Sequence, residues 1–115
     1  MARIASTVIH ETTLLLTLSG EFDLSGASSL RTTVRAAEGQ RQVILDLSGV
    51  TWLDSSTLAV IVSTYEAVNE RGGTLGLVRP RPDLWEIFEL TGLTHIPSFP
   101  TRESALAGGE LGGGP

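Results

Sequence analysis

The stretch that decides the expected fold is Val43–Val68, which reads VILDLSGVTWLDSSTLAVIVSTYEAV. It begins as a near-continuous apolar run and becomes polar at Ser48-Gly49, as expected of a buried strand followed by a turn. Asp54-Ser55-Ser56 then opens a helix, because Asp and Ser are favoured helix N-caps. The next apolar residues recur at helical spacing and predict one buried stripe of Leu58, Ile61, Val62, Tyr65 and Val68. The stretch therefore predicts a strand leading into a helix whose N-terminus carries two hydroxyls and a carboxylate.

Further strands and helices are expected on both sides of this stretch. Alternating and β-branched residues predict strands at 3–9 and 12–19, which a short connection around His10-Glu11 joins into a hairpin. The remaining expected elements are a helix at 25–38, a strand at 42–47, a helix at 55–70, a strand at 74–78, a helix at 82–91, an extended segment at 94–99 and a helix at 102–107.

This order of elements predicts the α/β fold class. We expect a single domain with a mixed four- to five-stranded sheet, an N-terminal hairpin and about four helices packed on the sheet. The domain should span residues 1–107. The glycine-rich residues 108–115 should form a disordered tail.

Composition and charge exclude several classes of protein. The 115 residues suit one domain, and 41% of them are hydrophobic, as in an ordinary globular protein. No run approaches the ~18 apolar residues that span a bilayer, and the N-terminus lacks the apolar region of a signal peptide. We therefore expect a cytoplasmic protein without membrane insertion. The net charge is −5 and the basic residues form no cluster beyond Arg79-Pro80-Arg81, which argues against nucleic-acid binding.

No cofactor or metal site is expected. The chain has no cysteine, and His10 and His95 are too far apart in the sequence for a typical zinc motif. The glycine-rich residues 72–76 follow a helix and precede a strand, which is the reverse of the order that a phosphate-binding loop needs.

Asp54-Ser55-Ser56 has a simple structural interpretation, which is that it only caps a helix. One good cap stabilises a helix by ~1 kcal/mol, and such triplets open helices in many proteins. Here, however, three cap-forming residues stand in a row, and neither Thr57 nor Leu58 is the Glu or Gln that would complete a capping box. The alternative is a helix N-terminus that presents a serine to another protein.

The motif and its neighbours resemble the STAS family, the domain of anti-sigma factor antagonists. The signature of that family is a strand, then D-S-S/T-G-L-G, then a helix. Gly20-Glu21-Phe22-Asp23 resembles the family's G-E-hydrophobic-D segment. Residues 84–93 resemble its late helix with a trailing T/S-G-L, and residues 101–106 its terminal helix. The resemblance covers residues 3–107 in order.

The resemblance assigns roles to individual residues. The family's phosphate acceptor is the serine directly after the aspartate, which is Ser55 here, with Ser56 as an alternative acceptor. Asp23 matches an aspartate near the phosphosite that contacts the partner, and its other interpretation is a turn or helix cap. Thr57 and Ala59 stand where the motif usually has glycine, so Thr57 is expected to add bulk where another backbone approaches. The implied partner-binding residues are Asp23, Asp54, Ser55, Ser56, Thr57 and Leu58.

The resemblance implies a regulatory binding protein and not an enzyme. Unphosphorylated, the chain would bind an anti-sigma factor that is a serine kinase, and so free a sigma factor for transcription. The kinase would phosphorylate Ser55 with its own Mg-ATP, and a PP2C-type phosphatase would restore the active form. The alternative is a non-switching STAS scaffold or subunit, in a stress-sensing assembly or a lipid-transport complex. A weak homodimer is a further partner that the resemblance allows. A third possibility is a small enzyme with Ser55 as its nucleophile. The sequence shows no general base for Ser55, which argues against this possibility.

Overall fold

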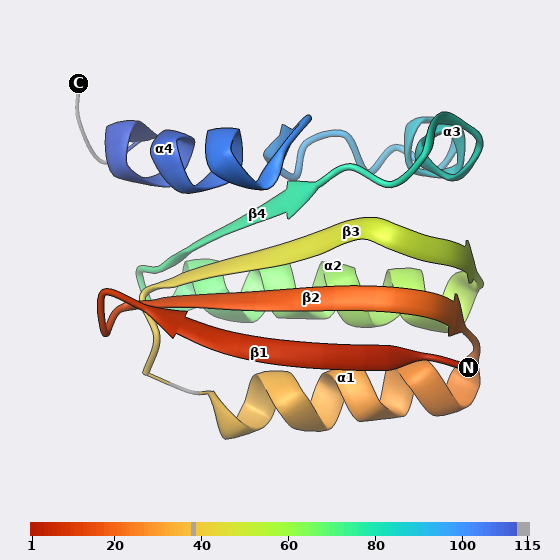
Figure 1. The fold of residues 1–115 in the computed structure, drawn as a ribbon, viewed down its shortest axis with the longest axis horizontal. Coiled ribbons are helices and arrows are strands. Elements are labelled where there is room, and N and C mark those ends of the chain that lie inside the picture. The colour runs from red at the N-terminus through yellow and green to blue at the C-terminus, as the bar shows by residue number, and fades with distance from the viewer. Residues whose placement is uncertain (38, 113–115) are drawn as a thin grey trace.

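The computed structural model describes the backbone of residues 1–37 and 39–112 and the side chains of residues 1–37 and 39–107. Strands and helices alternate along this part of the chain (Figure 1). Their order is β1 (Arg3–Ile9), β2 (Thr13–Phe22), α1 (Leu24–Ala36), β3 (Gln42–Leu53), α2 (Ser55–Glu70), β4 (Thr74–Val78), α3 (Pro82–Leu90), β5 (Ser98–Phe99) and α4 (Arg102–Gly112).

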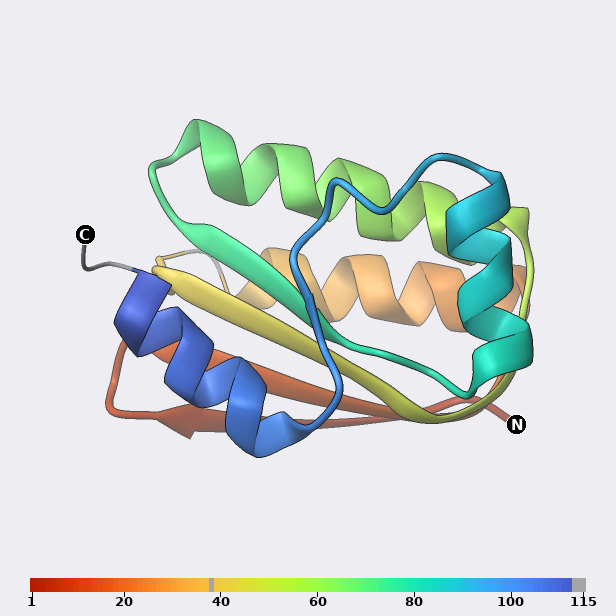
Figure 2. The same cartoon turned by 90° about the horizontal axis from the view of Figure 1, so that it is seen from above.

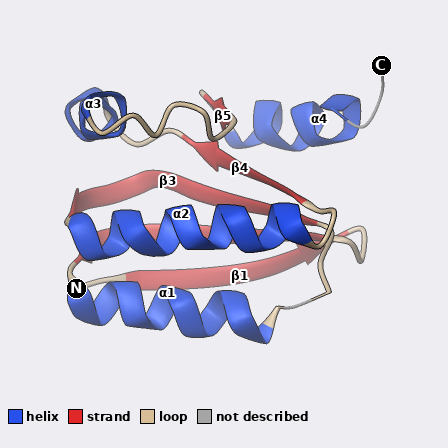
Figure 3. Ribbon diagram, turned by 180° about the vertical axis from the view of Figure 1, so that it is seen from behind, coloured by secondary structure: helices blue, strands red, loops and turns tan. Residues whose placement is uncertain are grey.

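The strands form one mixed sheet in the order β1-β2-β3-β4-β5. β1 and β2 pair antiparallel as the expected hairpin, and the turn residues His10 and Glu11 have positive φ angles of 54° and 65°. The other neighbouring strands pair parallel. α1 and α2 lie side by side on one face of the sheet, and α4 lies on the other face (Figures 2 and 3). The predicted α/β domain with a mixed sheet is therefore confirmed.

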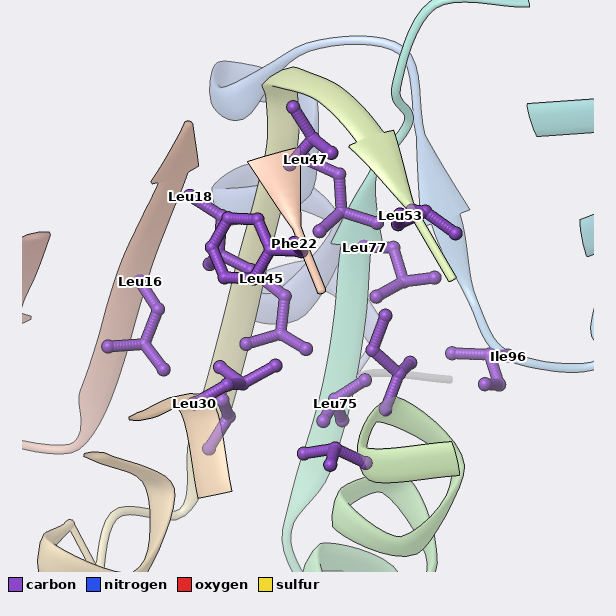
Figure 4. Packing of buried hydrophobic residues seen from close by; sticks show 14 of the residues in the cluster. Leu16, Leu18, Phe22, Leu30, Leu45, Leu47, Leu53, Leu75, Leu77 and Ile96 are labelled. Atoms are coloured by element: carbon purple, nitrogen blue, oxygen red, sulfur yellow. The ribbon is translucent and has the colours of Figure 1, made fainter. Parts of the chain in front are cut away.

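The main core lies between the sheet and the helices α1 and α2. Its fully buried side chains include Leu16, Leu18, Phe22, Leu30, Leu45, Leu47, Leu77 and Ile96 (Figure 4). Burying each such side chain stabilises the fold by roughly 1.5–3 kcal/mol. Because side chains alternate along a strand, a slip of one residue would turn the leucines of β2 and β3 out of the core. The core therefore fixes the register of the two central strands.

β2 and β3 run further than the sequence predicts. β2 ends at Phe22 and not at 19, and β3 ends at Leu53 although a turn was expected at Ser48-Gly49. That expected turn is instead a β-bulge, at which the pairing of β2 with β3 shifts its register. A Cβ on Gly49 would lie 3.1 Å from the carbonyl oxygen of Leu18, so glycine lets the two strands stay close.

The buried face of α2 also differs from the predicted stripe. The side chains that α2 buries are Thr57, Val60, Ile61, Thr64 and Val68. Leu58, Val62 and Tyr65 are only half-buried. Thr57 and Thr64 can be buried because their hydroxyls donate to the carbonyl oxygens of Phe22 and Val60, at 3.1 and 2.7 Å.

Three element ends differ from the prediction as well. β5 comprises only Ser98–Phe99 of the expected extended segment. α1 ends at Ala36, and residue 38, where the sequence placed its end, lies outside the described residues. α4 continues to Gly112, past the expected boundary at Ala107. Glycine costs a helix only about 1 kcal/mol per residue relative to alanine, so the glycines after Ala107 do not force a stop. The rest of the predicted tail, residues 113–115, lies outside the described residues.

α4 is held on the sheet by apolar packing of Ala105 against Leu15, Ile44 and Val78, and by an ion pair to one buried carboxylate. Asp46 of β3 is 2% exposed, and its Oδ2 accepts hydrogen bonds from Nη2 and Nε of Arg102 at 2.8 and 3.1 Å. Its Oδ1 accepts hydrogen bonds from the hydroxyl and the backbone N–H of Ser48 at 2.7 and 3.0 Å. Burial raises the pKa of Asp46, but the hydrogen bonds from Ser48 and the charge of Arg102 outweigh it, so the pKa lies below its ordinary value.

Asp46→Asn should lower the free energy of unfolding by about 1–3 kcal/mol, because it removes a charged acceptor that holds Arg102 and the bulge. A carboxyl whose pKa is depressed in the folded state stabilises the fold above its unfolded pKa, and this contribution is lost as the pH falls through the folded pKa. As the pH is lowered, the free energy of unfolding of Asp46→Asn should therefore fall less than that of the wild type. Urea unfolding from acidic to neutral pH measures both effects.

The matched control is Glu103→Gln, which removes a charge from the neighbouring exposed residue of α4. It should leave the stability and its pH dependence nearly unchanged. Equal unfolding curves for the two variants at every pH would contradict the role given to Asp46.

Candidate functional site

The candidate site is formed by the N-terminal ends of two helices, at the end of the sheet where the central strands β2 and β3 finish. Phe22 and Leu53 pair at the last position of the parallel ladder between β2 and β3. Asp23 and Asp54 follow these two residues, and they are the N-caps of α1 and α2. The two helices accordingly begin at the same end of the molecule (Figure 1). The sequence motif and the Asp23 segment, which are far apart in the chain, thus belong to one surface.

One carboxylate oxygen of Asp54 caps the helix. Its Oδ1 accepts hydrogen bonds from the backbone N–H groups of Ser56 and Thr57 at 3.1 and 3.3 Å, and from the Ser56 hydroxyl at 2.5 Å. The hydrogen bond from the Ser56 hydroxyl is the main reason that the pKa of Asp54 lies below its ordinary value, and the backbone donors add to it against an opposing effect of burial. Asp54 is therefore a carboxylate at neutral pH.

The two serines of the motif have different environments. Ser56 is half-buried and its hydroxyl donates to Asp54. Ser55 is exposed, and within the described residues its hydroxyl makes no hydrogen bond. Of the two predicted phosphate acceptors, Ser55 thus has the free and accessible oxygen, whereas Ser56 acts in the cap.

Asp23 has the capping role that the sequence analysis gave as its alternative. Its Oδ1 accepts hydrogen bonds from the backbone N–H groups of Ser25 and Gly26 at 3.0 and 3.2 Å. The residue remains exposed, so capping leaves its outer side open to another protein. The structural and the partner-binding interpretations of Asp23 are therefore compatible.

Thr57 does not add bulk to the surface, and this expectation from the sequence was wrong. Its side chain is 1% exposed and faces the core, where the hydroxyl donates to the carbonyl oxygen of Phe22. Leu58 is half-buried and Ala59 is exposed. Of the predicted partner-binding residues, Thr57 is the one whose side chain is buried, so a partner cannot contact that side chain.

Two large apolar side chains stand exposed beside the caps. Leu24, the first residue of α1, is 72% exposed, and Trp52 near the end of β3 is 47% exposed. An open hollow of about 950 Å³ runs along α1 from Asp54 to Thr33 and includes Asp23 and Leu24 in its lining. Leu24 was not among the residues predicted from the sequence. The signal that could have found it is an apolar residue directly after a capping aspartate, outside the helical spacing of the buried face.

The surroundings of Ser55 contain no histidine that could activate it. His10 lies in the turn between β1 and β2, at the opposite end of the sheet. His95 packs edge-on against Tyr65, with ring centroids 5.4 Å apart, and Tyr65 stands about 15 Å along α2 from Ser55. Within the described residues, no three His, Cys, Asp or Glu side chains gather in a group that could hold a metal ion. The site offers an exposed hydroxyl next to an ionised carboxylate, which suits recognition by another protein.

Comparison with known proteins places the chain in a family. The model of the STAS domain matches residues 5–105. The chain belongs to the STAS domain family. None of the helices in the described part of the chain is both long and apolar enough to cross a membrane.

Similar proteins carry the name of anti-sigma factor antagonists. The chain is 30% identical over 101 residues to the anti-sigma F factor antagonist of Paenibacillus polymyxa, which covers 84% of this chain and 86% of that protein. It is 33% identical over 88 residues to the anti-sigma-B factor antagonist of Bacillus subtilis (strain 168), with coverage of 76% and 81%. The crystal structure of an anti-sigma factor antagonist from Mycobacterium paratuberculosis superimposes with a TM-score of 0.85 at 28% identity, over 96% of this chain and 95% of that one.

Ser56→Ala should raise the pKa of Asp54 towards its ordinary value, because it removes the hydroxyl that donates to Oδ1. Ser55→Ala should leave this pKa unchanged, because the Ser55 hydroxyl is not bound to the carboxylate. A titration of the Asp54 side-chain carbon by NMR measures the pKa in both variants and in the wild type. A larger shift in Ser55→Ala than in Ser56→Ala would reverse the roles given to the two serines.

Proposed function

We propose that this chain is an anti-sigma factor antagonist that is switched off by phosphorylation of Ser55. In the unphosphorylated state it binds an anti-sigma factor that is also a serine kinase, and this frees a sigma factor in the cytoplasm. The observation that carries the proposal is the exposed hydroxyl of Ser55, which makes no hydrogen bond within the described residues and stands on the first residue of the aspartate-capped helix α2. The names of the similar proteins support the class of partner.

The proposed partner surface surrounds Ser55. It consists of Asp23, Asp54, Ser55, Ser56 and Leu58, flanked by the exposed Leu24 and Trp52. An exposed tryptophan is a common anchor of protein interfaces. The carboxylates require a partner that supplies hydrogen-bond donors or positive charge. Thr57 contributes from beneath the surface, through its hydrogen bond to Phe22.

A phosphate on Ser55 would be poorly compensated by the chain itself. It adds about −1.5 to −2 charges, and Asp54 next to it is already ionised. The cap also occupies the N–H groups of Ser56 and Thr57, which could otherwise bind an anion at a helix N-terminus. In solution water solvates the dianion and the fold persists. Under a bound partner the charge must be desolvated, and an uncompensated buried charge costs several kcal/mol.

The chemistry of the switch belongs to the partners. The kinase brings its own Mg-ATP and transfers the γ-phosphate to the Ser55 oxygen, and a PP2C-type phosphatase hydrolyses the phosphoserine to restore binding. One argument that left the alternative of a non-switching scaffold open was that Thr57 stands where the STAS motif usually has glycine. Because the Thr57 side chain is buried, that argument no longer favours a scaffold.

Ser55→Asp should weaken binding to the anti-sigma factor kinase of the same organism by about 100-fold or more, since each 1.4 kcal/mol is a factor of ten. Ser55→Ala should bind within about threefold of the wild type, because it adds no charge and breaks no hydrogen bond. Both should keep the wild-type circular dichroism. Isothermal calorimetry with the purified kinase measures the affinities.

The control for a charge placed on α2 is Ser63→Asp, at an exposed position two turns further along the same helix. It should bind like the wild type. Tight binding by Ser55→Asp would overturn the switch, and loss of binding by Ser63→Asp would show that any added charge on α2 is harmful.

A further inference from the structure

Two hydrogen bonds connect the end of β2, directly before α1, to the start of α2 through one carbonyl group. The carbonyl oxygen of Phe22 accepts a hydrogen bond from the backbone N–H of Asp54 at 3.2 Å and another from the Thr57 hydroxyl at 3.1 Å. The backbone N–H of Thr57 in turn donates to the Asp54 side chain at 3.3 Å. Thr57 therefore contacts the cap of its own helix through its backbone and the end of β2 through its side chain.

The Phe22 carbonyl lies at a sensitive place in the chain. It belongs to the peptide that leads into Asp23, and the carbonyl oxygen of Asp23 accepts the first helical hydrogen bond of α1, from Ala27 at 2.9 Å. A hydrogen bond to the Phe22 carbonyl oxygen restricts the rotation of this peptide. It therefore also restricts the orientation in which the chain passes from β2 into Asp23, the N-cap of α1. Thr57 supplies that donor from within the first turn of the helix that carries Ser55.

We propose that Thr57 is a positioning residue that holds the Asp23 cap and the Ser55 turn as one rigid surface for the partner. The proposal rests on the proposed function, because the surface it holds is the one that would bind the kinase. Glycine, which the STAS motif usually carries at this position, has no hydroxyl and could not make this bond. The connection therefore depends on the threonine of this chain and would be absent with glycine at this position.

The hydroxyl of Thr57, and not its bulk, should carry this role. Its side chain is buried, so a valine of nearly the same shape keeps the packing but leaves the Phe22 carbonyl with only the Asp54 N–H. A serine keeps the donor and loses only the methyl group. Thr64 provides a matched control on the same helix, because it is 5% exposed and its hydroxyl donates to Val60 within α2.

The test compares Thr57→Val, Thr57→Ser and Thr64→Val by amide hydrogen exchange and by affinity for the kinase. In Thr57→Val the N–H groups of Ser25 and Gly26, which bond to Asp23, should exchange about tenfold faster, and the affinity should fall about tenfold, as for one lost hydrogen bond. Thr57→Ser should restore both within about twofold. Thr64→Val should change neither, whatever it does to the overall stability.

The outcomes separate this proposal from the proposed function. Unchanged exchange at Ser25 and Gly26 in Thr57→Val would overturn the connection, and faster exchange with unchanged affinity would overturn its role in positioning. If the wild type itself does not bind the kinase, the proposed function fails, while the exchange data still decide whether the connection exists. If Thr57→Val does not fold, Thr57→Ala against Thr64→Ala gives the same comparison.

Discussion

The parallel pairing of β2 with β3 is the constraint on which the candidate site depends. It pairs Phe22 with Leu53 at the end of the two strands. The aspartates that follow them, Asp23 and Asp54, therefore cap two neighbouring helices. Parallel strands place their carboxyl ends together, and in open α/β sheets this edge is where ligands and partners bind. The β-bulge at Ser48-Gly49 is part of this constraint, since it lets β3 continue beyond the point where the sequence suggests a turn.

Charge distribution explains how one hydroxyl would act as the proposed switch at the carboxyl ends of β2 and β3. Asp54 is ionised, and its Oδ1 already accepts hydrogen bonds from the N–H groups of Ser56 and Thr57 and from the Ser56 hydroxyl, so these donors are not free to receive an added phosphate. A partner that supplies hydrogen-bond donors can cover a neutral serine beside this carboxylate, whereas covering a dianion on the same oxygen costs more. The fold itself needs no change for this switch to work, because the phosphate would stand on an exposed side chain.

Local signals in the sequence predicted much of the fold, and non-local contacts account for what it did not predict. The caps and apolar periods located every helix, and the Asp54-Ser55-Ser56 triplet located the site. The burial of Thr57 could not be read from the sequence, because it depends on a hydrogen bond to Phe22, 35 residues earlier. The ion pair between Asp46 and Arg102 joins residues that are 56 positions apart. Likewise, a glycine after a serine has the same local pattern in a turn as in a bulge, and only the partner strand distinguishes them.

The proposed switch requires that the Ser55 hydroxyl, and not that of Ser56, receives the phosphate. Site-resolved mass spectrometry of the wild-type chain, after incubation with the anti-sigma factor kinase and Mg-ATP, locates the phosphate. One phosphate per chain is expected, on Ser55, because the Ser56 hydroxyl is held by Asp54. Phosphate on Ser56 alone, or no phosphate with a kinase that modifies another antagonist under the same conditions, would overturn the proposed switch.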